Sequence, residues 1–279
     1  MKSKHMTNKH HQVLGESIYP DWMSQWTLDY LLIHNAILVT PNYRLMPEAS
    51  GTEIASDVAD FWTWLFHSLP DYLAHAHPGI EADLDRICST GASAGGYLAV
   101  QSAFRRDQAY GRVRAVIGAY PMLDVGSEFF SRELGTQYPG GLPTLPGSVL
   151  DDHLASVVPG AVVSEVDPPG RFQLAVAMVQ RGRWAEFLGE DEELYPMRMV
   201  EKVEEGKVPF MFFFHGVDDT GVPVEGTVRF VQKVNEKFGN GKCYLYTGPG
   251  EHGFDLPFKV DDPWMKEGLG RVTEAWLGN

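Results

Sequence analysis

The sequence has few cysteines and few basic residues. Cys88 and Cys243 are the two cysteines among 279 residues, and each lies in an apolar, strand-like run. We therefore expect two buried free thiols rather than a disulfide or a reactive cysteine. Lysine and arginine together number 23 against 37 aspartates and glutamates, so the formal net charge is −14 at pH 7. A surface this acidic repels polyanions, which argues against nucleic acid and anionic membranes as partners.

Long hydrophobic runs and targeting signals are also missing. Residues 1–12 are polar and rich in histidine, without the apolar core of a signal peptide. The longest early apolar run, residues 31–40, contains His34 and Asn35 and is too short to cross a bilayer. Residues 277–279 match no retention or peroxisomal signal. These absences predict a cytoplasmic protein without a membrane-spanning segment.

Short apolar runs alternate with longer amphipathic stretches along most of the chain. This alternation is typical of a mostly parallel sheet flanked by helices, an α/β fold, which we expect to form one domain over residues 1–279. The expected strands are residues 36–43, 86–90, 113–120, 208–214 and 243–246. The expected helices are residues 51–69, 95–104, 224–237 and 263–277.

The alternation is lost between residues 125 and 207. Residues 137–170 are rich in proline and glycine, and a loop of that length is uncommon in a compact domain unless it serves a function. Two amphipathic stretches, residues 171–181 and 184–188, predict helices. We interpret residues 125–207 as a helical cap inserted over the edge of the sheet. A disordered insertion is the alternative.

One short turn carries the strongest chemical signal. Gly91-Ala92-Ser93-Ala94-Gly95 follows a predicted strand and precedes a predicted helix. A serine at such a turn adopts strained backbone angles, and only small residues fit two positions before and two after it. The turn exposes the hydroxyl above the sheet and directs the N–H of Ala94 towards the place where an oxyanion would form. The turn therefore predicts Ser93 as a nucleophile and Ala94 as an oxyanion donor.

Partners for this serine follow it in the chain. A serine hydroxyl needs a base to take its proton and a carboxylate to orient that base. Asp218 and Asp219 come soon after the predicted strand at 208–214, and His252 lies in a glycine-rich loop after the last predicted strand. All these groups follow the carboxyl ends of strands, where open α/β sheets bind ligands. Their order, serine then acid then histidine, is the order used in α/β hydrolases.

Four segments together carry a family resemblance. They are Pro41-Asn42-Tyr43-Arg44-Leu45-Met46-Pro47-Glu48, the Gly91–Gly96 turn, the His215–Pro223 loop and Glu251-His252-Gly253-Phe254. With them the chain resembles, from about residue 17 to its C-terminus, the α/β-hydrolase fold-3 group of hormone-sensitive-lipase-like carboxylesterases and small hydrolases of fungal secondary metabolism.

The resemblance implies a serine esterase that acts on a small-molecule acyl or ester substrate, in secondary metabolism. Ser93 matches the nucleophile of the group, Asp219 its acid and His252 its general base. Asp219 is preferred over Asp218 because the pattern His-Gly-x-x-Asp-x-x-Val-Pro places the acid there. This chemistry needs no cofactor, and no histidine pair in the sequence has convincing metal-ligand spacing.

The N-terminus departs from the pattern of that group. Its members carry a His-Gly-Gly-Gly loop that supplies further oxyanion donors, and here that loop should fall near residues 8–12, which contain no glycine. We also expect the strands that should precede the loop to be missing. Loss of one oxyanion donor costs about 2.7–4 kcal/mol, so we expect weakened activity. An open sheet edge would suit a partner subunit, as in a homo-oligomer.

Two other interpretations compete with an esterase. Residues 90–96 superficially resemble the glycine loop of short-chain dehydrogenases, but Tyr97 stands where the third glycine should be and the chain has no Tyr-x-x-x-Lys sequence. The second alternative is a catalytically impaired hydrolase fold that binds a small molecule or serves an assembly, because a fold alone does not prove an activity.

Overall fold

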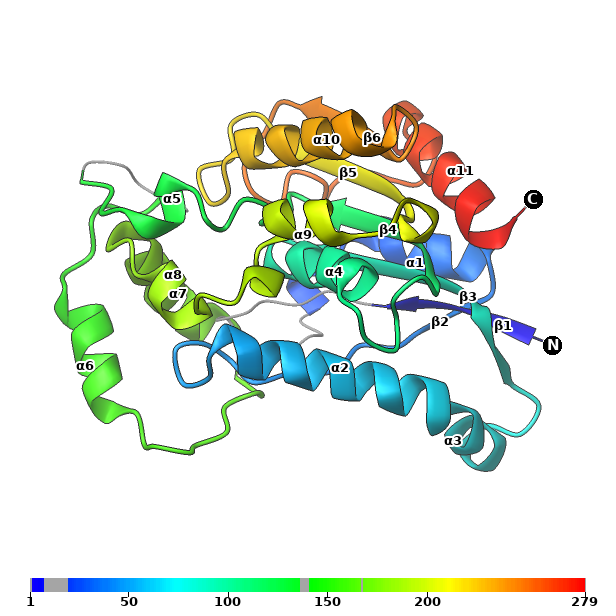
Figure 1. Ribbon diagram of the computed structural model, residues 1–279, viewed down its shortest axis with the longest axis horizontal. Helices are drawn as coiled ribbons and strands as arrows, with labels where there is room; N and C mark the ends of the chain where they lie inside the picture. The colour runs from blue at the N-terminus through cyan, green and yellow to red at the C-terminus, as the bar shows by residue number, and fades with distance from the viewer. Residues whose placement is uncertain (1, 8–19, 136–140, 167, 279) are drawn as a thin grey trace.

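The computed structural model describes residues 2–7, 20–135, 141–166 and 168–278. At the centre of these residues is one six-stranded parallel sheet in the order β2-β1-β3-β4-β5-β6 (Figure 1). Its strands are β1 (Lys2–Thr7), β2 (Ala36–Leu38), β3 (Glu81–Ala92), β4 (Val113–Ala119), β5 (Phe210–Gly216) and β6 (Cys243–Gly248). The predicted α/β fold, a parallel sheet flanked by helices, is confirmed.

The N-terminal edge of the sheet differs from the prediction. β1 lies between β2 and β3 and pairs with both, so the expectation that no strand precedes residues 8–12 was wrong. Lys-Ser-Lys-His-Met-Thr has almost no apolar pattern, and backbone pairing on both sides defines this strand instead. β2 ends at Leu38 rather than at Tyr43, ahead of Pro41, which has no N–H for a ladder. Residues 8–12 lie outside the described residues.

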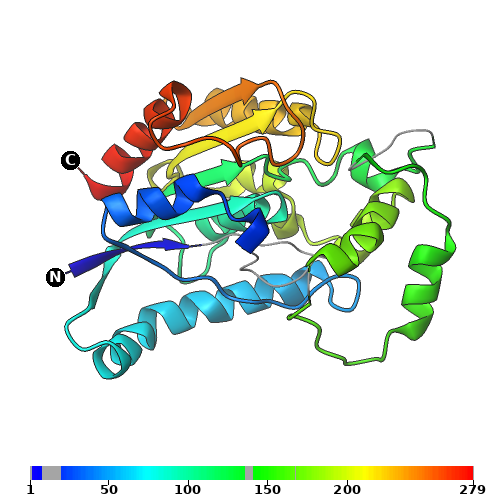
Figure 2. The ribbon, with the colours of Figure 1, turned by 180° about the vertical axis from the view of Figure 1, so that it is seen from behind.

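Helices cover both faces of the sheet. α2 (Gly51–His67), α4 (Ala94–Phe104) and α10 (Val224–Phe238) lie on the face seen in Figure 1, and α3 (Leu69–Ala76) follows α2. α1 (Gln25–Ile33) and α11 (Pro263–Leu277) lie on the opposite face, seen in Figure 2. β5 supplies side chains to both sides: Phe212 and Phe214 pack with α1 and α11, whereas Phe213 packs with α4 and α10.

Local sequence signals explain where the main helices begin. At the start of α2, the Ser50 hydroxyl accepts from the N–H of Glu53, and the Glu53 carboxylate accepts from the N–H of Ser50. Pro263 stands in the first turn of α11, where its missing N–H has no helical partner to lose. Among the helices of the described residues, none combines the length and the apolar character needed to cross a membrane.

The segment 125–207 contains five α-helices among its described residues. They are α5 (Glu128–Ser131), α6 (Ser148–Ser156), α7 (Phe172–Gln180), α8 (Trp184–Leu188) and α9 (Pro196–Lys202). α7 and α8 correspond to the two predicted amphipathic helices. α5 to α8, which we name the cap helices, lie beyond the carboxyl ends of the strands, on the left of Figure 1. α9 instead packs against α4 and α10, so it belongs to the helical layer on the sheet.

A buried ion pair fastens the cap helices to the rest of the fold. Arg171, directly before α7, donates to both carboxylate oxygens of Glu48, at 2.9 and 2.7 Å, and to the carbonyl of Met46 at 2.8 Å. The two side chains are 9% and 7% exposed. His153 of α6 lies 3.0 Å from the same carboxylate. One loop of the main layers therefore holds two cap helices.

Candidate active site

Ser93 stands at a sharp turn between β3 and α4. Its backbone angles are φ 56° and ψ −121°, in a region that non-glycine residues avoid at a cost of about 1–3 kcal/mol. Neighbouring backbone holds it there: the N–H of Ser93 donates to the carbonyl of Ala119 at 2.8 Å, and its carbonyl accepts from the N–H of Met122 at 3.2 Å. Hydrogen bonds with β4 and the loop that follows it therefore hold Ser93 in its strained conformation.

The glycines around Ser93 are required by packing. A Cβ atom on Gly91 would lie 2.2 Å from the carbonyl group of Gly95, and one on Gly96 would lie 2.5 Å from Pro121. Real Cβ atoms do not approach other atoms so closely. The tight passage of the chain from β3 into α4 therefore explains the predicted small residue at Gly91, and it requires a further one at Gly96.

Asp219 and His252 meet at the same edge of the sheet. Asp219 follows β5, His252 follows β6, and the His252 Nδ1 lies 2.8 Å from the Asp219 Oδ2. The other carboxylate oxygen of Asp219 accepts from the N–H groups of Gly221 and Val222, both at 2.8 Å. The Asp219 side chain is fully buried. Burial alone would raise its pKa, but hydrogen bonds from His215 and His252 outweigh burial and hold the pKa well below its usual value.

Asp218 has a different partner. Its Oδ2 accepts from the N–H of Gly250 at 2.8 Å, and its own N–H donates to the carbonyl of Gly250 at 3.1 Å. Thr220 donates from its N–H and its hydroxyl to Glu251, at 2.9 and 3.0 Å. These bonds tie the loop after β5 to the loop after β6. Asp218 thus aligns the two loops, while Asp219 contacts the imidazole.

His215 is a residue of this site to which the sequence analysis gave no role. It is fully buried at the end of β5, and its Nε2 lies 2.9 Å from the carbonyl of Val222 and 3.2 Å from Asp219. Because a carbonyl can only accept, this nitrogen carries the hydrogen and shares it with Asp219. A polar side chain that ends a wholly apolar strand was the available signal, because buried polar groups need hydrogen-bond partners.

Tyr120 is a second residue that the sequence analysis did not single out. It follows β4 with a positive φ of 37°, and its ring centroid lies 4.4 Å from that of His252. Burial, and after it the charge of nearby Asp255, raises the pKa of Tyr120 well above its usual value. The phenol therefore stays protonated and gives one side of the imidazole a neutral, rigid neighbour.

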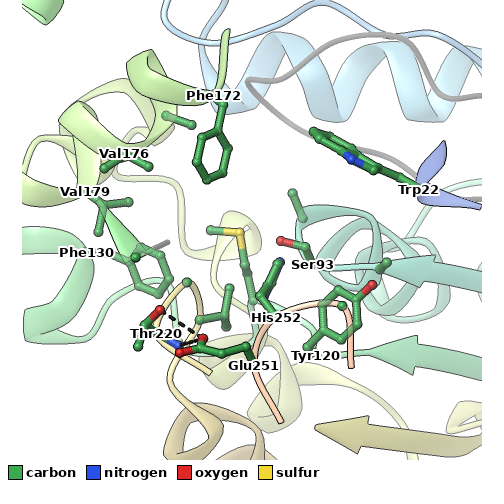
Figure 3. Close-up of a pocket in the computed structure, with 18 of the residues that line it drawn as sticks. Trp22, Ser93, Tyr120, Phe130, Phe172, Val176, Val179, Thr220, Glu251 and His252 are labelled. Carbon is green, nitrogen blue, oxygen red and sulfur yellow. Dashed lines mark hydrogen bonds between the residues drawn. The ribbon is translucent and has the colours of Figure 1, made fainter. Parts of the chain in front are cut away.

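A cavity of about 490 Å³ lies between the strand ends and the cap helices (Figure 3). Ser93, Ala94 and His252 line it, and Figure 3 shows the side chains of Ser93 and His252 next to one another. Glu251 is the one acidic side chain among its described lining residues, and no lysine or arginine is among them. The side chains on the cap side are apolar and include Phe130, Phe172, Ala175, Val176, Val179 and Trp184.

Ala94 is the first residue of α4, so its N–H belongs to the first helical turn, whose N–H groups have no partner within the helix. It adjoins Ser93 on the cavity wall. The loop expected to supply further oxyanion donors, residues 8–12, lies outside the described residues. Within the described ranges, no cluster of three or more histidine, cysteine or acidic side chains could hold a metal ion.

Comparison with known proteins shows the family. The profile of the α/β-hydrolase fold family matches residues 20–180, more than half of the chain. A protein of Phoma sp. named "Probable carboxylesterase M8" is 30% identical over 273 residues, which cover 95% of this chain and 82% of that protein. "Probable carboxylesterase clz11" of Cochliobolus lunatus is 31% identical over 199 residues, which cover 68% of this chain and 87% of that protein.

The chain therefore belongs to the α/β-hydrolase fold family, as the resemblance in its sequence predicted, and is carboxylesterase-like within it. A solved structure supports the fold: a protein of unknown function from Staphylococcus aureus superposes with a TM-score of 0.64 at 20% identity, and the match covers 98% of this chain and 89% of that one.

Proposed function

We propose that the protein is a serine esterase that hydrolyses uncharged carboxylic esters with Ser93 as nucleophile, His252 as general base and Asp219 as the acid that orients the base. The main support is the hydrogen bond of 2.8 Å between His252 and the buried carboxylate of Asp219, on the wall that Ser93 shares. In the described structure Ser93 and His252 line the same cavity without a hydrogen bond between them. This is compatible with the proposal, because the hydrogen bond between nucleophile and base often forms or shortens only when substrate binds.

In this mechanism the Ser93 hydroxyl attacks the ester carbonyl and its proton passes to the free nitrogen of His252. The carbon–oxygen bond to the alcohol then breaks, and the alcohol leaves with the proton held by His252. A water molecule then attacks the acyl-serine while His252 takes its proton. The bond between the acyl carbon and the Ser93 oxygen breaks, the carboxylic acid leaves, and His252 returns the proton to the Ser93 oxygen. Asp219 keeps the imidazole in the required tautomer and stabilises its positive form, and no cofactor takes part.

The N–H of Ala94 would stabilise the oxyanion of both tetrahedral intermediates. It follows the nucleophile directly and stands at the positive end of α4. A single donor leaves the hole incomplete unless residues 8–12 contribute others. Weakened activity, by a factor of roughly 10²–10³ for one missing donor, therefore stays a prediction.

The cavity favours a neutral, largely apolar ester. Its cap side carries aromatic and aliphatic side chains, and the lining residues that the structure describes include no lysine or arginine for a substrate carboxylate or phosphate. The names of the two fungal relatives support a carboxylic ester as substrate. We further propose, from the sequence resemblance alone, that this ester belongs to secondary metabolism. A cytoplasmic location, a homo-oligomer and a single domain over residues 1–279 stay predictions.

A fluorophosphonate probe tests the proposal, because it labels serines activated by a base. The purified protein is expected to take up one probe molecule, and Ser93→Ala is expected to lose both labelling and p-nitrophenyl ester turnover, by roughly 10⁶-fold in kcat. Ser68→Ala is the matched control, since Ser68 is exposed and makes no cap hydrogen bond at the start of α3. Labelling that survives in Ser93→Ala would remove Ser93 from the mechanism. A folded protein that takes up no probe would favour the alternative of a catalytically impaired hydrolase fold that binds a small molecule or serves an assembly.

A further inference from the structure

A second cavity lies next to the active-site cavity and shares two lining residues with it. The second cavity has a volume of about 360 Å³ and lies between the loop after β4, α5 and the start of α10. Phe130 and Val222 line both cavities, so they form the partition between them. Both side chains are nearly fully buried, at 3% and 5% exposed. Val222 belongs to the support of Asp219, which leaves Phe130 as the part of the partition that is independent of the catalytic groups.

Two aromatic rings lie beside Phe130. Its ring lies 5.9 Å from that of Trp184 in α8 and 5.0 Å from that of Phe129, its neighbour in α5. Figure 3 shows Phe130 on the side of the cavity away from Trp22, with Ser93 and His252 between them. A substrate chain that extends from Ser93 in the direction away from Trp22 therefore meets Phe130.

We propose that Phe130 determines substrate specificity by ending the apolar pocket and so limiting the length of the ester chain that fits. The proposal rests on the proposed esterase function. With Phe130 present, a longer chain has no further apolar space and must leave methylene groups in water. With a small residue there, the two cavities join. Each newly buried methylene then favours binding about fourfold, at about 0.8 kcal/mol per methylene.

The second cavity would accept a neutral chain rather than an anionic one. Its lining includes Asp124, Glu128 and Glu225, and its one arginine, Arg229, is paired with Asp124 at 2.7 Å. A chain that ends in a carboxylate would therefore meet carboxylates without a free cation. This restricts the proposed substrates to esters with uncharged alkyl or aromatic ends.

The test compares p-nitrophenyl esters from acetate to dodecanoate in the full-length protein and two neighbouring variants. We expect Phe130→Ala to change the chain-length preference. Its kcat/KM for chains that gain two or more buried methylenes, divided by its own kcat/KM for acetate, should exceed the same ratio in the unaltered protein at least about tenfold. Phe129→Ala is the matched control, because Phe129 lines the second cavity and not the first. Its ratio to the unaltered protein is expected to stay flat along the series.

Two results would overturn the proposal: a Phe130→Ala profile parallel to that of the unaltered protein, or an equal rise with chain length in Phe129→Ala. If Phe130→Ala does not fold, Phe130→Leu decides, because it removes less volume and should show a smaller rise in the same direction. Turnover of acetate by the unaltered protein separates the two proposals. If acetate is hydrolysed and the profiles stay parallel, the esterase function stands and only the role of Phe130 falls.

Discussion

Removal of Arg171 should destabilise the fold far more than removal of any surface arginine. In Arg171→Met the Glu48 carboxylate, 7% exposed, keeps its burial and loses its bidentate cation. Breaking a buried pair from one side typically costs about 3–5 kcal/mol. For a chain of this size that corresponds to a fall in Tm of roughly 6–20 °C. Urea unfolding at pH 7, followed by the fluorescence of the seven tryptophans, measures the free energy directly.

A matched control separates this effect from the general loss of an arginine. Arg183 pairs with Glu186 on α8, and the two side chains are 32% and 55% exposed. Arg183→Met is therefore expected to cost about 0.2–1 kcal/mol. The double variant Glu48→Gln/Arg171→Met has no buried unpaired carboxylate at position 48. It should recover a large part of the free energy of unfolding that Arg171→Met loses.

The pH dependence gives a second, independent check. Burial by itself raises the pKa of Glu48, but the hydrogen bond and charge of Arg171 outweigh it, so the pKa lies below its usual value. A carboxyl with a depressed folded pKa stabilises the fold above about pH 4.3, and this stability is lost as pH falls through the folded pKa. In Arg171→Met, burial still raises the pKa of Glu48 and the arginine no longer lowers it. Protonation of Glu48 at acid pH then removes the buried negative charge that destabilises the variant.

The free-energy gap between the unaltered protein and Arg171→Met should therefore narrow from pH 7 towards pH 4. His153 of α6 also faces the Glu48 carboxylate, at 3.0 Å. A gap of 1 kcal/mol or less at pH 7, on the scale of an exposed pair, would refute the reasoning. So would a large gap that stays constant with pH.

Two further outcomes test the catalytic edge. Asp219→Asn should lower kcat for ester hydrolysis by roughly 10⁴-fold. Asp218→Asn should keep kcat near the unaltered value, because the amide oxygen can still accept from the N–H of Gly250. Equal losses of kcat in the two variants would contradict the assignment of Asp219 as the acid. Gly91→Ala places a Cβ 2.2 Å from the carbonyl group of Gly95 and should cost at least about 1–3 kcal/mol in thermal unfolding. Gly270 lies at an exposed position of α11 with no atom near its missing side chain, so Gly270→Ala should instead raise the free energy of unfolding by about 0.5–1 kcal/mol. Equal stability of the Gly91→Ala and Gly270→Ala variants would contradict the close packing at Gly91.

Sequence patterns predicted those parts of the site whose geometry is local. The strand-turn-helix passage at Ser93 needs small residues at fixed offsets, and such a pattern can be recognised in five consecutive residues. Asp219 and His252 were found because each comes after a strand, and the carboxyl ends of parallel strands share one edge of the sheet. The order of the strands left Asp218 and Asp219 both possible, and the pattern of the resembled family decided the choice of Asp219.

The parts that the sequence did not predict depend on contacts between distant segments. Glu48 and Arg171 are separated by 123 positions, and nothing near either residue indicates the other. Phe130 lies between the two cavities together with Val222, a residue far from it in the sequence. β1 was missed for a related reason. Five of its six residues are polar, and its place between β2 and β3 comes from backbone pairing that leaves no trace in the hydrophobic pattern.

Two histidines contact the same carboxylate, and their surroundings decide which can move a proton. His215 has no exposed surface, and both of its ring nitrogens are occupied, one by Thr227 and the other by Val222 and Asp219. It can orient and stabilise the carboxylate, but it has no free nitrogen for a substrate. His252 uses one nitrogen for Asp219, and its ring is 33% exposed on the cavity wall. Because His215 and two backbone N–H groups stabilise Asp219 whatever the charge on His252, the acid stays ionised when His252 is neutral and ready to accept the serine proton.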